Sequence, residues 1–305
     1  MNLRHVALAL QLAAGCARHD PAAVPLLVSP AWLTAHQDDP HLVLLHVGEE
    51  DGYRTAHLPG ARFVQLKDIA IGNDHESPLH LELPPPDDLR QRLQQLGISN
   101  DSRIVVYFGK DWVSPATRVV LTLDAAGLGA HAGLLDGGMP AWQRAGGKVT
   151  DAVPPPRTGK LAPLEMQPLV VDATRVLESL GKPGIAVVDA RDAEFYTGAK
   201  TGGMPPHQHR TGHIAGARGV PFGSVFDDDN RLRSIPELAA LFARAGVKPG
   251  DVVVGYCHIG QQATAMLLAA RRLGHEVLLY DGSFEDWSLH HPGYPIETTS
   301  REATP

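Results

Sequence analysis

Short apolar runs alternate along the chain with longer segments in which apolar residues recur at helical spacing. In the second half, the runs IAVVDA (185–190), DVVVGY (251–256) and EVLLYDG (276–282) are rich in β-branched and aliphatic residues, as buried parallel strands are. The segments PELAALFARAG (236–246) and ATAMLLAARRLG (263–274) have the helical spacing and end at a glycine, which is typical of a helix C-terminus. Alternating strands and helices predict an α/β fold, an open parallel sheet with helices on both faces.

The first half of the chain repeats this order. LVLLHV, RIVVYF and AGLLDGG are the corresponding strand candidates, and DLRQRLQQLG and ATRVVLTLDAAG are the helix candidates. HLPGAR (57–62) matches HIAGAR (213–218), and LLDGGMPAW (134–142) matches LYDGSFEDW (279–287). Two copies about 150 residues apart indicate a duplicated domain rather than a solenoid of short repeats.

The domain boundaries follow from composition. A segment rich in proline and without periodicity, 151–167, is predicted to be a linker. It separates a first domain over 25–150 from a second over 168–300, and residues 1–24 form a leader of different character.

Composition narrows the class of protein. The chain has 305 residues, of which 43% are hydrophobic and 20% charged, as in a water-soluble globular protein. Its formal net charge of −7 and its lack of Lys/Arg clusters exclude a general nucleic-acid surface. No apolar run has the roughly 18–20 residues that a membrane-spanning helix needs.

The leader predicts export. Arg4 precedes an apolar stretch, and LAAGC places small residues before Cys16, as in a secretory signal or a lipoprotein box. We therefore expect a periplasmic protein or one that a lipid on Cys16 anchors to a membrane; the alternative is a cytoplasmic protein. If Cys16 is removed or acylated, Cys257 is the only thiol left and no internal disulfide can form.

Cys257 follows a predicted strand and precedes a predicted helix. Ligands of open parallel sheets bind beyond the carboxyl ends of the strands, which is where this cysteine lies. A short loop curling into a helix N-terminus can direct backbone N–H groups at one point and stabilise an anion or a thiolate there. The loop therefore suits a nucleophilic cysteine, although a buried cysteine packed as a small apolar residue is the alternative. The loop and its flanks comprise Cys257, His258, Ile259, Gly260, Gln261 and Gln262, with the helix beginning at about Ala263.

The motifs together resemble those of tandem-domain rhodaneses. HLPGAR and HIAGAR are similar to the first signature of the family, LGISNDSRIVVY and LLDGGMPAW fit its first domain, and YCHIGQQAT fits its active-site loop. The resemblance implies two rhodanese-like domains, with catalysis in the C-terminal one. It also implies a sulfurtransferase in which the loop cysteine takes a sulfane sulfur from a small-molecule donor as a persulfide. A thiophilic acceptor, cyanide or a thiol, then receives the sulfur, without metal, nucleotide or flavin; we expect a monomer.

The resemblance also assigns site residues. It implies that Arg191 binds the anionic group of the donor, for which a guanidinium is well suited; a surface arginine paired with Asp192 or Glu194 is the alternative. Residues 258–262 are expected to contact substrate, and Asp189 and Ala263 to support the loop. For His258 a role as cation or hydrogen-bond donor and a role as solvent-facing spacer both stay open.

The first domain is expected to be catalytically silent. Aligning the two helices places Lys110, or its neighbour Gly109, opposite Cys257, and the loop GKDWVSP contains no thiol. This copy is then a scaffold that walls the cleft, and Trp112 is more plausibly a packed loop residue than a site residue. His57 and His213 recur in both halves, which favours a structural role for them.

Two polar stretches are weak metal candidates. His207, His209 and His213 share a Pro/Gly-rich loop without a cysteine, so we predict no zinc site there. DDDN (227–230) lacks the glycine and glutamate of a calcium loop and is predicted to be a solvated turn.

The donor is the least determined feature. CHIGQQ has neither the basic pair typical of thiosulfate enzymes nor the small neutral loop typical of 3-mercaptopyruvate enzymes. We favour thiosulfate, with 3-mercaptopyruvate as the alternative. A cysteine phosphatase or arsenate reductase is disfavoured because Ala263 stands where a Cys-x5-Arg loop needs arginine. A non-catalytic persulfide sensor is the remaining alternative.

Overall fold

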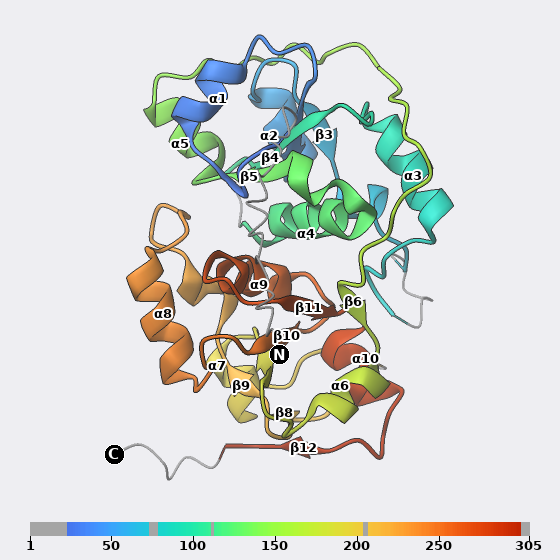
Figure 1. Ribbon diagram of the computed structural model, residues 1–305, viewed down its shortest axis with the longest axis vertical. Helices are drawn as coiled ribbons and strands as arrows, with labels where there is room; N and C mark the ends of the chain where they lie inside the picture. The colour runs from blue at the N-terminus through green and yellow to red at the C-terminus, as the bar shows by residue number, and fades with distance from the viewer. Residues whose placement is uncertain (1–22, 73–78, 111–112, 204–206, 300–305) are drawn as a thin grey trace, which may run out of the picture.

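Each half of the chain forms its own five-stranded parallel sheet in the computed structural model (Figure 1). The structure describes residues 23–72, 79–110, 113–203 and 207–299. The first sheet has the strand order β1-β5-β4-β2-β3, and the second has the matching order β6-β11-β10-β7-β9. The predicted fold class, two parallel sheets flanked by helices, is therefore confirmed.

The elements of the two halves correspond one to one over most of their length. The first half contains β1 (Leu27–Val28), α1 (Pro30–His36), β2 (Leu42–Val47), α2 (Glu50–Thr55), β3 (Arg62–Val64), α3 (Pro86–Gln95), β4 (Arg103–Phe108), α4 (Ser114–Leu123), β5 (Ala132–Leu135) and α5 (Gly138–Arg144). The second contains β6 (Val170–Val171), α6 (Ala173–Ser179), β7 (Ile185–Asp189), α7 (Ala193–Thr197), β8 (His213–Ile214), β9 (Arg218–Gly219), α8 (Ile235–Arg244), β10 (Val252–Tyr256), α9 (Gln262–Arg272), β11 (Val277–Tyr280), α10 (Ser283–Leu289) and β12 (Ile296–Glu297). Short helical turns lie at η1 (Leu66–Asp68), η2 (Asp124–Leu128), η3 (Gly129–His131) and η4 (Phe222–Val225).

The central strands are buried on both faces, which explains their nearly continuous apolar sequence. In β4, Val105 and Tyr107 belong to the core on the side of α1 and α5, whereas Ile104 and Val106 belong to the opposite core. That second core is continuous through α4 and α9 into the second half. The two domains thus share one apolar interior rather than meeting across a wet surface.

α4 and α9 form the contact between the halves (Figure 1). The helices occupy equivalent places in the two domains, and equivalent residues meet across the contact. The hydroxyl oxygens of Thr117 and Thr264 lie 2.8 Å apart, and Arg271 forms an ion pair with Asp124 two turns further on. We call this contact the α4–α9 seam; around it an approximate two-fold axis relates the two domains.

Most predicted element ends match the structure. α8 and α9 are followed by Gly246 and Gly274, whose φ angles of 78° and 87° only glycine adopts readily. In the described part of the chain, no helix or named strand lies between Arg144 and Val170, where the linker was predicted. No helix among the described residues is long and apolar enough to cross a membrane. Most of the predicted leader, with Cys16, lies outside the described residues.

Candidate active site

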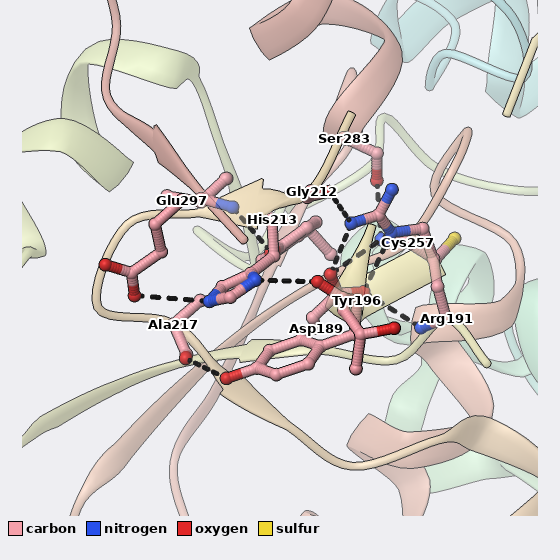
Figure 2. Close-up of polar contacts among 12 residues, drawn as sticks. Asp189, Arg191, Tyr196, Gly212, His213, Ala217, Cys257, Ser283 and Glu297 are labelled. Carbon is pink, nitrogen blue, oxygen red and sulfur yellow. Dashed lines mark hydrogen bonds and ion pairs between the residues drawn. The ribbon is translucent and has the colours of Figure 1, made fainter. Parts of the chain in front are cut away.

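Two neighbouring strands of the second sheet bring the candidate residues to one edge. β10 and β7 pair in parallel with Tyr256 opposite Asp189, so the residues that follow both strands emerge side by side at their carboxyl ends. Cys257 follows β10, and Arg191 follows β7 by two residues. Figure 2 shows Asp189, Arg191 and Cys257 as neighbours, with dashed contacts to Gly212 and Ser283.

Cys257 is fully buried at the start of its loop, with 0% of its surface exposed. Its backbone is fixed on both sides by the segment that begins α10. The Cys257 N–H donates to Ser283 Oγ at 3.2 Å, and the Cys257 carbonyl accepts from the Phe284 N–H at 3.0 Å. These two hydrogen bonds fix the backbone from which the Cys257 side chain extends. A nucleophile needs such a fixed backbone if it is to meet a substrate in a defined geometry.

The loop after Cys257 leaves its backbone donors unused. The N–H groups of residues 258–262 donate to no other residue that the structure describes. Gly260, at the middle of the loop, has a φ of 76°, and α9 begins at Gln262. Consecutive free N–H groups at a helix N-terminus form a concavity that stabilises negative charge. The sequence predicted such a concavity around the thiol, and Cys257 is at the same time a member of the apolar core that includes Ala263.

Arg191 and Asp189 form a buried ion pair beside Cys257. Arg191 is 1% exposed, its Nη2 lies 2.6 Å from Asp189 Oδ2, and its Nε lies 3.0 Å from Asp189 Oδ1. Nη2 also donates to the Gly212 carbonyl at 2.8 Å, and the guanidinium carbon stacks 3.9 Å from the Phe284 ring centroid. The alternative of a surface arginine paired with Asp192 or Glu194 is therefore wrong.

The electrostatics of Arg191 reflect these contacts. Burial alone lowers its pKa, but the ion pair with Asp189, reinforced by Cys257, leaves that pKa above its ordinary value. Its Nη1 is the one guanidinium nitrogen for which no described residue is a partner. Arg191 is thus a fixed cation paired with Asp189, and its Nη1 has no partner among the described residues.

His258 is half-buried and neutral. Desolvation, followed by the nearby Arg191 charge, lowers its pKa to about 4, and the same two causes lower the pKa of His209 to about 4. The Phe195 ring meets the His258 ring edge-on at 4.6 Å, and the His209 ring lies 5.9 Å away. At neutral pH His258 therefore offers a hydrogen bond and not a cation, and it is not a solvent-facing spacer.

Gly202 and His209 belong to a segment present only in the second domain, and both lie close to His258. Residues 197–212 separate Tyr196 from His213, where the first domain has only 54–56 between Tyr53 and His57. A Cβ at Gly202 would lie 2.7 Å from His258 Nδ1 and 3.1 Å from His209 Nδ1, so the segment approaches closely. This insertion makes the surroundings of Cys257 different from those of the equivalent place in the first domain.

The histidines of the two repeated turns make the same contacts in both halves. Nδ1 of His57 lies 2.7 Å from the Tyr53 carbonyl, and Nδ1 of His213 lies 2.7 Å from the Tyr196 carbonyl. Each histidine also stacks on that tyrosine. Because the contacts are shared with the half that lacks a thiol, they support the predicted structural role.

The first domain places Phe108, not Lys110 or Gly109, at the position of Cys257. Tyr107 accepts the Leu58 N–H through its hydroxyl, just as Tyr256 accepts the Ile214 N–H, so the residues after the two tyrosines correspond. Aligning the helices gave the wrong residue because the loop of the first domain, 109–115, is two residues longer than 258–262. The position still lacks a thiol, and Trp112 lies outside the described residues.

The remaining loop residues differ in what they contact. Gln261 Nε2 donates to Ser114 Oγ of α4 at 3.0 Å, which ties the loop to the first domain. Gln262 Oε1 is buried and accepts from no described residue. Ile259 is half-buried, and Ala263 is buried in the core that also contains Cys257.

Ser283 was missed in the sequence, although it holds the Cys257 amide. Its φ of 53° is left-handed, as is the 57° of Gly138 at the equivalent place in the first domain. Its hydroxyl also donates to the Tyr280 carbonyl at 2.9 Å. The comparison of LYDGSFEDW with LLDGGMPAW would have found it, since serine replaces a glycine that the repeat requires.

Replacing Ser283 separates its hydrogen bond from its backbone strain. Ser283→Ala leaves the buried Cys257 N–H without an acceptor and should lower the free energy of unfolding by about 1–2 kcal/mol. Ser283→Gly loses the same bond but relieves a left-handed conformation that costs about 1 kcal/mol. Urea unfolding should therefore rank the glycine variant above the alanine variant; equal stabilities would contradict the strain.

The described residues contain no group of three or more His, Cys, Asp and Glu side chains placed to hold a metal ion. In the DDDN stretch, Asp227 Oδ1 instead accepts the N–H groups of Asp229 and Arg231 at 2.9 Å each, which closes a turn. His213 of the histidine-rich stretch contacts the Tyr196 carbonyl and the Glu297 carboxylate.

Known proteins resemble this chain in sequence and in fold. The Rhodanese-like domain model matches residues 29–145 and again 172–290. A thiosulfate sulfurtransferase of Pseudomonas aeruginosa is 31% identical over 278 residues, which cover 90% of this chain and 97% of that protein. A 3-mercaptopyruvate sulfurtransferase of Escherichia coli is 30% identical over 281 residues, covering 88% and 97%.

A solved structure agrees with these matches. The structure of SseA from Escherichia coli, described as a 3-mercaptopyruvate sulfotransferase with the rhodanese fold, superposes with a TM-score of 0.73 at 28% identity. The superposition covers 85% of this chain and 99% of SseA. The chain therefore belongs to the rhodanese family and contains two rhodanese-like domains in tandem.

Proposed function

We propose that this protein is a thiosulfate sulfurtransferase that carries a sulfane sulfur on Cys257 and delivers it to cyanide or a thiol. The observation that carries the proposal is the loop itself. A single thiol at the end of β10 is followed by five consecutive N–H groups that donate to no described residue and lead into α9. Family membership and the names of the relatives support sulfur transfer, but these names include two donors.

The reaction proceeds by two displacements at sulfur. The Cys257 thiolate attacks the outer sulfur of thiosulfate, a new S–S bond forms, and sulfite leaves with the electron pair of the broken S–S bond. Cyanide or a thiolate then attacks the outer persulfide sulfur, and the cysteine leaves as a thiolate. Each step begins and ends with an anionic sulfur in the loop, so N–H groups fixed in advance stabilise every state of the cycle.

Arg191 supports an anionic donor in this proposal. Its side chain is buried beside Cys257, and Nε and Nη2 are engaged by Asp189 and Gly212. It therefore acts as a fixed positive charge with one nitrogen, Nη1, directed to the donor, and not as a bidentate clamp. The neutral His258 adds a hydrogen bond beside it.

A side-by-side donor screen tests the donor. With the purified protein and cyanide as acceptor, kcat/KM for thiosulfate should exceed that for 3-mercaptopyruvate by about tenfold or more, a difference of about 1.4 kcal/mol in transition-state binding. Thiosulfate gains more from the Arg191 charge because it bears two negative charges and 3-mercaptopyruvate bears one on its carboxylate. A larger kcat/KM for 3-mercaptopyruvate would transfer the assignment to that donor.

The complete burial of Cys257 favours one further candidate, a persulfide-binding or sensor protein. Such a protein would load one sulfur on Cys257 but would not pass it on when acceptor is added. Mass spectrometry before and after cyanide distinguishes the two functions. Export and acylation of Cys16 belong to the same proposal and rest on the leader sequence alone.

A further inference from the structure

One arginine of the silent first domain reaches the active-site loop of the second. Arg118 lies in α4, is 1% exposed, and crosses the α4–α9 seam. Its Nη1 donates to the Gly260 carbonyl at 3.2 Å and to Asp281 Oδ1 at 2.5 Å. Its Nη2 donates to the Leu81 carbonyl at 2.6 Å. Burying the charge of an arginine in an apolar helix costs free energy. The contacts that offset this cost therefore indicate the role of Arg118.

The contact with Gly260 sets the direction of a loop N–H group. A peptide unit is planar, so the carbonyl of Gly260 and the N–H of Gln261 point in opposite directions. By holding that carbonyl, Arg118 orients the Gln261 N–H, one of the donors without a described partner. The backbone at Gly260 also lies too close to its neighbours for a side chain, because a Cβ there would lie 2.7 Å from the Asp281 carbonyl oxygen and 3.1 Å from Arg118 Nη1.

Asp281 connects this contact to the anchor of the thiol. One oxygen of Asp281 accepts from Arg118, and the other accepts the Leu83 N–H at 2.8 Å. Two residues later, Ser283 holds the Cys257 N–H. The middle of the loop and its first residue are therefore held by one short segment, and Arg118 fixes that segment to the first domain.

We propose that Arg118 is a positioning residue for sulfur transfer, through which the first domain completes the reactive loop of the second. The inference rests on the proposed sulfur chemistry of Cys257. Without Arg118, the Gly260 carbonyl loses its side-chain donor, and the direction of the Gln261 N–H is held less firmly. The thiolate and the persulfide then lose a preorganised donor, while the fold of each sheet is retained.

The seam provides a matched control. Arg271 also crosses between α4 and α9, pairing with Asp124, but it lies at the far end of α9 from the loop. Arg118→Met and Arg271→Met each remove one ion pair between the domains, and only the first touches the loop. Arg118→Lys keeps the charge opposite Asp281 but not the guanidinium fork that reaches Gly260 and Leu81 together.

The experiment compares the three full-length variants with the wild type below their unfolding temperatures. Rapid-quench mass spectrometry measures how fast Cys257 gains one sulfur from thiosulfate. Arg118→Met should slow this step about 10- to 100-fold, less than the 10²–10³-fold for removing a direct donor. Arg118→Lys should recover part of the loss, and Arg271→Met should stay within about twofold of wild type. Iodoacetamide alkylation of Cys257 across a pH series should show the midpoint moved to higher pH in the Arg118 variants alone.

Several outcomes would overturn the proposal. Sulfur loading by Arg118→Met at the rate of Arg271→Met would leave Arg118 only an interface role. If Arg118→Met does not fold, Arg118→Lys takes its place in the test. Sulfur loading by Arg118→Lys at the rate of Arg271→Met would then contradict the positioning role. A wild type that gains no sulfur refutes the proposed function instead, and the alkylation midpoints then test the positioning role on their own.

Discussion

Replacing Cys257 with serine is expected to abolish persulfide formation and to reduce turnover by about 10⁴-fold or more, as removal of a covalent nucleophile does. A serine hydroxyl stays protonated at neutral pH, and its oxygen forms no stable bond to a sulfane sulfur. The substitution changes one atom in a side chain that is fully buried, so the fold should survive it. The loss would then report on chemistry and not on stability.

The measurement combines steady-state rates with intact-protein mass. Wild type should gain the mass of one sulfur atom on incubation with thiosulfate and lose it on addition of cyanide, whereas Cys257→Ser should do neither. Cys16→Ser is the control, since it removes the only other cysteine of the sequence and should leave both steps unchanged. Turnover that persisted in Cys257→Ser would remove the proposed nucleophile.

Asp189→Asn should lower the free energy of unfolding by about 3–5 kcal/mol, the cost of breaking a buried ion pair by removing one partner. The variant keeps the shape of the side chain but leaves the Arg191 guanidinium buried without its counter-charge. Arg191 cannot move its charge to solvent, because Gly212 and the Phe284 ring hold it in place. The Asp189 carboxylate also orients the Arg191 guanidinium through Nε and Nη2, so its loss should slow sulfur loading.

Urea unfolding followed by tryptophan fluorescence measures this stability change. Glu194→Gln is the matched control, since it removes a carboxylate from the exposed Lys200–Glu194 pair in the same domain and should barely shift the midpoint. If Asp189→Asn unfolded together with that control, the Asp189–Arg191 pair would contribute no net stability. The pair would then serve the active site and not the stability of the fold.

The apolar pattern predicted the strands and helices that line the core. Such elements are predicted from their own residues: β4 and β10 are largely apolar runs, and α8 and α9 are each followed, two residues on, by a glycine with positive φ. The two-residue edge strands β1 and β6 were not predicted, because a strand that short is defined by its neighbour and not by its sequence. The β8–β12 pair joins segments too far apart in sequence for a local pattern to reveal.

The candidate site divides in the same way. The place of the Cys257 loop was predicted because the strand–helix order is local, whereas Asp189 and Arg191 were assigned by the resemblance to rhodaneses. Arg118 and His209 were not predicted as site residues, since each reaches the loop only through tertiary packing. The error over the residue equivalent to Cys257 has a similar origin. Aligning the helices and aligning the strands of the two domains give positions two residues apart, and only the contacts of Tyr107 and Tyr256 show that Phe108 is the equivalent residue.

The α4–α9 seam also determines which halves can associate. Asp124 and Arg271 occupy equivalent positions and attract each other in the tandem chain. Two first halves joined in the same manner would oppose aspartate to aspartate, and two second halves would oppose arginine to arginine, so both homotypic pairings are repulsive. A duplicated domain would otherwise be prone to self-association through its apolar helix. A single charge reversal between the copies makes heterotypic docking the favoured arrangement.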